Sequence, residues 1–446
     1  MHRYHRVSRS ILTKESEVVT FSRARMLPRA GVLVAAGALF LAGCAETSSG
    51  GGGGNGGGEG VAFGATIEEY HEAFADVDPI VLYTQSPSTQ GSTGGAFIDA
   101  YTSAVEEWSD GKITFDIAYS DAIAKSTEID NAIVDGRLDI GQVLAVYEPQ
   151  EFPATSALLD ASVLSDQSVV TGVLQSNAWP ADVALNTPEI VAEFEDKGMK
   201  LMLPAYNAGM NALFCSENRT ALPDYQGRSI SVGSTAGTQQ VSALGSTPTS
   251  VAYTEAYEAL QRGVIDCSML SPAAAQIGGI LEVAPQTVID PQAGLAVPSG
   301  NMAMNLDVWE SLPLVAQQLM WDRLDAFMTG SIEGKIWPVT VESVQEIQQY
   351  GGTIQPFADD SRVAVQDAND KIVDAIAGNS GLSDGAGFVT TVRESADKWS
   401  GIVGELGYTN ETDYNGFATW YSPGKIDIDP YVQRVYEEIF LPYRPS

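Results

Sequence analysis

The stretch from Asp224 to Ser271 constrains the fold more than any other part of the chain. Polar and apolar residues alternate over Ser229–Val232, which predicts a strand with one buried face. A helix is expected over Tyr253–Arg262, followed by an apolar strand over Val264–Met269. A Gly/Ser/Thr turn between the first strand and this helix opens a further short helix. Such close alternation predicts a parallel sheet, which places ligands at the carboxyl ends of its strands.

The same order of elements occurs earlier in the chain. We expect a strand over Ile113–Tyr119, a helix over Ser126–Asp135 and a strand over Leu138–Val143. The junction from helix to strand reads Gly-Arg-Leu-Asp from Gly136 and Gly-Val-Ile-Asp from Gly263. The repeat predicts an α/β protein with two lobes of similar design and a cleft between them. A coincidence of two glycines that end helices would give the same pattern.

The phrase E-x-Y-x-A-L-Q-x-G-x-x-D from Glu255 to Asp266, with Gly227 and Val232 before it, carries a family resemblance. It resembles the second-lobe signature of the DctP-type solute receptors, which serve tripartite ATP-independent periplasmic (TRAP) transporters. A looser likeness extends over residues 80–357. The resemblance implies a two-lobed, type II-like periplasmic-binding-protein architecture of the Venus flytrap kind, with a long helix in the C-terminal half spanning both lobes. It also implies a receptor that closes on a small solute and delivers it to membrane subunits.

The chain departs from this family at the position of its substrate-binding arginine. That position is Ser231 here, and the family's nearby asparagine falls near Leu270. Arg228 lies three residues earlier, so on a strand it faces the opposite side. Because a bidentate arginine is the usual partner of a carboxylate, the loss leaves three ligand classes open. These are a neutral polar solute, a zwitterion, and a carboxylate held by hydroxyls and backbone amides.

The front of the chain indicates export. Seven of the 24 Lys and Arg residues but only two of the 57 Asp and Glu residues lie in the first 44 positions. The rest of the chain is therefore strongly acidic, and it would repel nucleic acid. Gly31–Leu41 is an apolar run too short to span a bilayer. Leu41–Cys44 resembles a bacterial lipobox, so Cys44 is the expected lipidation site. Residues 1–25 lie upstream of a complete signal, so Met26 is a candidate start. The alternative is a secretory signal in which the cysteine occurs by chance. We therefore expect an extracytoplasmic protein that is lipid-anchored to the outer face of the cytoplasmic membrane.

After the signal region of residues 1–44, the pattern divides the remaining chain into five parts. A Gly-rich tether is expected over 45–75, lobe I over 76–208, lobe II over 209–298, the return strand and helix of lobe I over 299–335, and helices completing lobe II with a C-terminal extension over 336–446. Cys215 and Cys267 both lie on apolar strands of lobe II. Outside the cell they would form a disulfide or remain two buried thiols.

The sequence gives little evidence for a catalytic or cofactor-binding motif. The histidines are His2, His5 and His71, so a Ser–His–Asp site would depend on His71 alone. No phosphate-binding G-x-x-x-x-G-K-[ST] motif is present in the sequence. We therefore expect no enzyme, no cofactor and no metal.

Polar and aromatic residues near the expected strand ends form the predicted ligand site. They are Gln85, Ser86, Asp121, Gln142, Tyr147, Tyr206, Asn207, Ser231, Ser234 and Ser271. The expected partners are a small solute, the small and large TRAP membrane subunits, and the membrane through the lipid anchor, with no nucleic acid. A ligand-sensing receptor for a membrane kinase and a binding protein of an ATP-driven importer are the alternatives.

Overall fold

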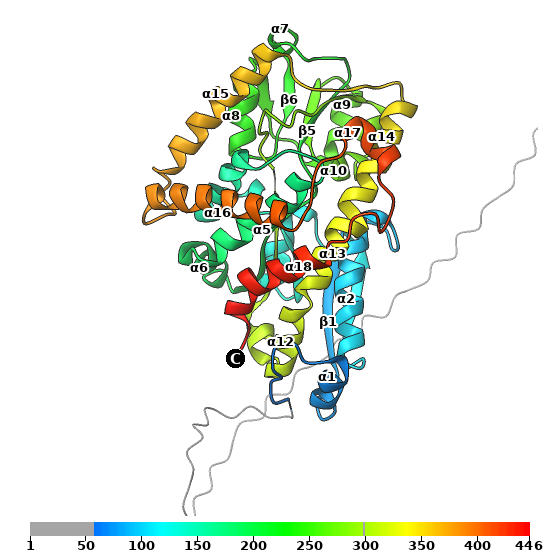
Figure 1. Cartoon of the computed structure of the whole chain (residues 1–446), viewed down its shortest axis with the longest axis vertical. Helices are drawn as coiled ribbons and strands as arrows, with labels where there is room; N and C mark the ends of the chain where they lie inside the picture. Colours follow the sequence, from blue (N-terminus) through cyan, green and yellow to red (C-terminus); the bar gives the residue numbers. More distant parts are fainter. Residues whose placement is uncertain (1–57, 298) are drawn as a thin grey trace, which may run out of the picture. The chain divides into compact units, whose positions relative to one another are not determined.

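The structure is a computed structural model that describes residues 58–297 and 299–446. The signal region, Cys44 and most of the Gly-rich tether lie outside the described residues. Two groups of strands define the two lobes, and the helices pack around them (Figure 1). Residues 54–446 form one compact unit, so the residue boundaries expected between the lobes stay predictions. None of the described helices combines the length and the apolar character that crossing a membrane would require.

Lobe I is built on five strands. They are β1 (Ile80–Ser86), β2 (Ile113–Tyr119), β3 (Ile140–Val143), β4 (Met199–Asn207) and β10 (Ser299–Asn305). β1 and β2 pair in parallel along their whole length, while β10 runs antiparallel between β3 and β4. The two-stranded sheet and the three-stranded sheet of lobe I lie next to each other. The Asp139 amide, just before β3, donates to the Tyr83 carbonyl of β1 at 2.8 Å. The expected strand over Ile113–Tyr119 is thus confirmed, and β10 is the return strand implied by the resemblance.

Lobe II is built on one six-stranded sheet. Its strands, in spatial order, are β11 (Ile354–Gln355), β9 (Gln286–Val288), β5 (Ala212–Cys215), β8 (Cys267–Leu270), β6 (Ser229–Ser231) and β7 (Thr247–Thr249). β6 pairs in parallel with both β7 and β8. The connecting helices are α8 (Thr235–Ala243) and α9 (Ala256–Gln261), so the alternating unit expected from the sequence is confirmed.

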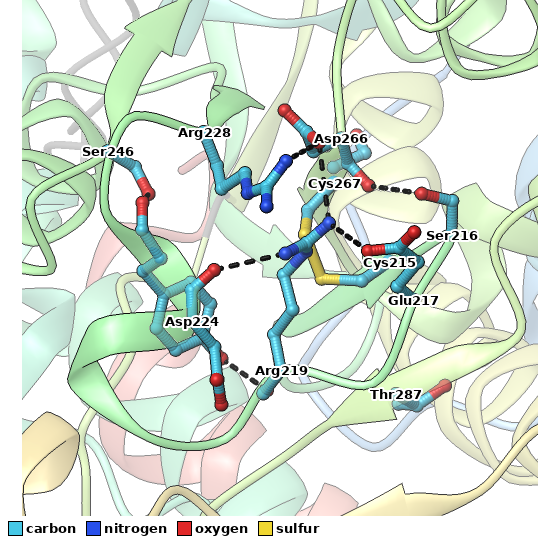
Figure 2. Close-up of a disulfide and its surroundings, with 12 residues drawn as sticks. Cys215, Ser216, Glu217, Arg219, Asp224, Arg228, Ser246, Asp266, Cys267 and Thr287 are labelled. Carbon is cyan, nitrogen blue, oxygen red and sulfur yellow. Dashed lines mark hydrogen bonds and ion pairs between the residues drawn. A yellow bond between two sulfur atoms is a disulfide. The ribbon is translucent and has the colours of Figure 1, made fainter.

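A disulfide joins two neighbouring strands of lobe II. Figure 2 shows the bond between Cys215 on β5 and Cys267 on β8, which lie directly opposite each other in the antiparallel pair. Beside it, the buried guanidinium of Arg219 lies 2.8 Å from a Glu217 oxygen and 3.4 Å from an Asp266 oxygen. Both half-cystines are fully buried, so the bond lies in the hydrophobic core of this lobe.

A long helical segment connects the lobes. It runs through α13 (Leu324–Ser331), a π-helical turn over Ile332–Ile336 and α14 (Trp337–Gln349), and it is seen in yellow in Figure 1. α13 packs on α2 (Ala96–Trp108) of lobe I, whereas α14 packs on α10 (Pro272–Ile277) of lobe II. We call the turn over Ile332–Ile336 the π-turn. The long helix implied by the resemblance is therefore present.

The other helices cover the lobes and wrap the C-terminal part of the chain around them. They are α1 (Ile67–Phe74), α3 (Ile129–Val134), α4 (Pro153–Asp160), α5 (Thr171–Leu185), α6 (Pro188–Glu195), α7 (Leu222–Tyr225), α11 (Leu306–Ser311), α12 (Leu314–Asp322), α15 (Asp359–Ile376), α16 (Gly385–Glu405), α17 (Tyr414–Trp420) and α18 (Asp429–Val435). α16 packs on α5, α17 on α14 and α18 on α13. The C-terminal extension thus contacts several parts of the fold.

The expected tether over 45–75 is too long. α1 begins with a capping box formed by Thr66 and Glu69, and it buries Tyr70 and Phe74. Because an amphipathic helix with a cap and buried aromatic residues belongs to the core, this end of the tether is part of the folded protein.

Candidate ligand-binding cavity

A cavity of about 140 Å³ lies between the two lobes, and we call it the interlobe cavity. Lobe I contributes residues at or near the carboxyl ends of β1, β3 and β4, as expected for ligand sites in α/β sheets. Lobe II contributes the end of β8 and the start of α10, and the π-turn contributes Lys335. The walls thus come from both lobes and from the helix that connects them.

A hydrogen-bonded group at one side of the cavity joins the lobes. The Gln85 amide nitrogen donates to an Asp121 carboxylate oxygen at 2.9 Å, and the Ser126 hydroxyl donates to the other oxygen. The Ser126 hydroxyl also lies 3.2 Å from the hydroxyl of Tyr253, which belongs to lobe II. Burial raises the pKa of Asp121, while the hydrogen bonds from Ser126 and Gln85 oppose this change. Asp121 therefore has its partners within the protein.

Aromatic residues form much of the remaining wall. Tyr206 on β4 packs against Phe97 and Phe327, with ring centroids 5.8 Å and 5.1 Å away. A Cβ atom at Gly300 would lie 2.7 Å from the Tyr206 hydroxyl, so glycine at this position leaves room for the tyrosine. Burial raises the pKa of Tyr206, which keeps its hydroxyl protonated and able to donate.

Tyr147 closes the cavity from the side of lobe I. Its ring atoms lie 3.1–3.3 Å from the position a Cβ would take at Gly233 of lobe II, so the two lobes meet closely there. Tyr147 also lines a second hollow of about 400 Å³ on the other side, together with Ser234.

Lys335 is the charged cavity residue that the sequence did not indicate; the polar residues Ser126, Tyr253 and Ser299 of the lining were not predicted either. Its side chain is buried, and its ammonium lies 4.2 Å from the centroid of the Phe97 ring. Among the described residues, no carboxylate forms an ion pair or a hydrogen bond with it. Burial lowers its pKa to about 8. The available signal was a basic residue between Gly334 and the apolar pair Ile336 and Trp337, in a stretch that also contains Glu333.

The structure brings six of the ten predicted site residues together in the interlobe cavity. These are Gln85, Asp121, Gln142, Tyr147, Tyr206 and Ser271. Ser271 also caps α10, because its hydroxyl accepts from the Ala274 amide at 3.2 Å.

Four predicted residues do not line this cavity. The clamp position Ser231 points into lobe II, where its hydroxyl lies 2.7 Å from that of Ser268 on the adjacent strand β8, and it is 1% exposed. Ser234 caps α8, accepting from the Gly237 amide at 3.0 Å. Both side chains serve the secondary structure of lobe II, so the expectation that Ser231 faces the cleft is wrong.

Asn207 and Ser86 are also held within lobe I. The Asn207 side-chain amide donates to the Ser176 hydroxyl at 2.9 Å and accepts from the Gly209 amide at 3.0 Å. The hydroxyl of Ser86 accepts from the Ser88 amide at 3.3 Å. Both residues sit at strand ends as expected, but their side chains turn away from the cavity.

Arg228 does not replace the missing arginine. Its guanidinium is partly exposed and lies 3.5 Å from an Asp266 oxygen, near the disulfide (Figure 2). A larger groove of about 990 Å³ runs along α13 and α18, but no residue of the lobe II strands lines it. The interlobe cavity combines walls from both lobes with a buried lysine that has no ion pair among the described residues.

Comparison with known proteins assigns the family. The sequence model of DctP, described as bacterial extracellular solute-binding protein, family 7, matches residues 85–379. No curated relative matches the chain.

Solved structures share the fold. A pyroglutamate-specific TRAP solute-binding protein of an unidentified marine microbe has a TM-score of 0.60 at 15% identity, covering 71% of this chain and 99% of its own. A TRAP solute-binding protein of Bordetella bronchiseptica with bound mandelate has a TM-score of 0.62 at 18% identity, covering 72% and 99%. One of Rhodoferax ferrireducens with copurified benzoate has a TM-score of 0.63 at 17% identity, covering 73% and 99%. Since the family match extends over more than half of the sequence, the chain belongs to the DctP family of extracytoplasmic solute-binding proteins and has the two-lobed fold of TRAP receptors.

Proposed function

We propose that the chain captures a small organic solute in the interlobe cavity and delivers it to TRAP membrane subunits. The observation that carries this proposal is the origin of the cavity walls, which come from both lobes and from the helix between them. Separation of the lobes opens such a site, and their closure buries the solute. The solute favours the closed state by the difference between its affinities for the two states.

The solute class follows from the size and lining of the cavity. A volume of about 140 Å³ admits a compact molecule, and the lining combines aromatic walls with a few polar groups. The structural neighbours named above carry pyroglutamate, mandelate and benzoate, which are small organic acids. We infer that this chain binds a solute of similar size, and that lipid attachment at Cys44 keeps the receptor at the membrane.

A thermal-shift screen tests the receptor function. The panel contains small sugars, amino acids, amides and organic acids, because a ligand that binds only the folded state raises the melting temperature. The substitution Ala274→Phe places a bulky ring in the cavity wall, and Ala375→Phe adds the same ring on the exposed face of α15 as a control. We expect at least one solute to stabilise the wild type and the control but not Ala274→Phe. Equal stabilisation of all three proteins would place the solute elsewhere, and no stabilisation of the wild type across the panel would contradict the function.

A further inference from the structure

We propose that Lys335, in the π-turn of the long helix, is the cation that binds the carboxylate of the solute. The proposal deepens the receptor function above and rests on it. It assigns the ligand as a compact monocarboxylate with an apolar body. The charge comes from the helix that connects the lobes rather than from the strand position occupied by Ser231.

The first argument is the unpaired charge. Ammonium groups are rarely buried without a partner, because removing them from water is costly. Lys335 is only 6% exposed, and no carboxylate of the described residues pairs with it. The Phe97 ring, 4.2 Å from the ammonium, compensates part of this cost through a cation–π contact. The remaining side of the ammonium borders the cavity, where an anion would complete its surroundings.

The second argument is the local construction that places the lysine. Two glycines allow the long helix to approach α2 closely. A Cβ at Gly330 would lie 2.6 Å from the Ala100 Cβ, and a Cβ at Gly334 would lie 3.1 Å from the Ala96 Cβ. This contact brings the π-turn over the first turn of α2, which carries Phe97. π-helical turns inside α-helices occur frequently at functional sites. The turn and the close contact together direct Lys335 into the cavity.

The third argument is the charge balance of the cavity. Among its lining residues, the charged ones are Lys335 and Asp121. Asp121 already accepts hydrogen bonds from Gln85 and Ser126, so its charge is satisfied within the protein. The rest of the wall is largely apolar, with Phe97 and Ile129 among its members. One carboxylate on the solute matches the one lysine of the lining, whereas a second carboxylate would find no further cation there.

The experiment compares acids with their neutral amides. Benzoate, mandelate and pyroglutamate are each paired with the corresponding primary amide, and binding is measured by calorimetry at pH 7. The proteins are the wild type, Lys335→Met, and Lys371→Met, which removes an exposed lysine of α15 as the matched control. We expect at least one acid to bind the wild type at least tenfold more tightly than its amide. We expect Lys335→Met to lose at least tenfold in affinity for that acid and Lys371→Met to bind as the wild type does.

Several outcomes would overturn the inference. They are equal binding of acid and amide, retained acid affinity in Lys335→Met, and no binding of any of the acids. The comparison of acid and amide on the wild type needs no variant, so it stands even if Lys335→Met does not fold. Mass spectrometry of any solute released from the purified protein separates this inference from the receptor function. A neutral released solute would overturn the role of Lys335 and leave the receptor function intact.

Discussion

At the scale of single residues, the buried ammonium of Lys335 should reduce the stability of the unliganded protein. Burial lowers its pKa to about 8 from the ordinary value of 10.5. This difference corresponds to about 3 kcal/mol at pH 7, where the lysine is charged in both the folded and the unfolded state. We expect Lys335→Met, which keeps an apolar stem of similar length, to raise the free energy of unfolding by an amount approaching this figure.

The difference in stability between the wild type and Lys335→Met should depend on pH. Between pH 8 and 10.5 the folded state has released the proton while the unfolded state still holds it, so the wild type gains stability relative to Lys335→Met. Urea unfolding of both proteins at pH 7 and pH 10 should show the difference shrinking. A lysine that stabilised the fold would give the opposite result, with Lys335→Met less stable at pH 7.

Sequence patterns located some of these residues and not others for physical reasons. Gln85 and Gln142 lie at or near strand ends, and a parallel arrangement of strands brings such residues to one edge. Ser231 was misplaced because the face that a three-residue strand presents depends on its neighbours in the sheet. Lys335 was missed because an α-helical period of 3.6 residues does not reveal a π-turn, which changes the direction of a side chain.

At the scale of secondary-structure elements, the disulfide between β5 and β8 should contribute strongly to the stability of lobe II. It closes a chain segment with a sequence separation of 52 residues. The loss of chain entropy in the unfolded state corresponds to about 4 kcal/mol for a loop of this size. We expect the double substitution Cys215→Ala/Cys267→Ala to lower the free energy of unfolding by about 2–4 kcal/mol, measured in urea. A reducing agent should lower the stability of the wild type and leave that of the double variant unchanged. Equal stability of the oxidised wild type and the double variant would contradict the prediction.

Element boundaries were less predictable than element types. The strand expected over Ser229–Val232 is observed as β6, Ser229–Ser231, and the one expected over Val264–Met269 is observed as β8, Cys267–Leu270. The reason is that β6 pairs with β7 over the three residues Ser229–Ser231, while β8 pairs with β5 over Ala212–Cys215. Pairing between strands that are distant in sequence therefore sets where each strand begins and ends. The local alternation of polar and apolar residues does not reveal these limits.

At the scale of the whole molecule, Asp322 at the end of α12 joins three distant parts of the chain. Its carboxylate accepts from the hydroxyls of Tyr70 and Tyr436 and lies 2.8 Å and 3.0 Å from two nitrogens of Arg444. Because Asp322 is buried, Arg444→Leu would leave an unpaired carboxylate, and we expect it to cost about 3 kcal/mol. Urea unfolding tests this, and adding Asp322→Asn to Arg444→Leu should restore part of the loss. If the double variant is destabilised as much as Arg444→Leu alone, the lost packing of Arg444, and not the lost ion pair, is responsible.

At the same scale, the lipid attachment proposed at Cys44 can be tested directly. We expect Cys44→Ser to abolish incorporation of labelled fatty acid and to move the protein from the membrane fraction to the soluble extracytoplasmic fraction, because one thiol carries the anchor. The control is Cys215→Ala/Cys267→Ala, which should remain in the membrane fraction. Retention of Cys44→Ser in that fraction would contradict lipid attachment at this residue.

The π-turn gives the long helix one additional consequence. In an α-helix each residue advances the side-chain direction by about 100°, so deletion of a single residue within Ile332–Ile336 would restore regular winding and turn the ammonium away from Phe97. The amino-acid composition of the chain would hardly change, yet the charge would leave the interlobe cavity. Insertion or loss of one codon could thus separate related receptors that prefer acids from those that prefer neutral solutes.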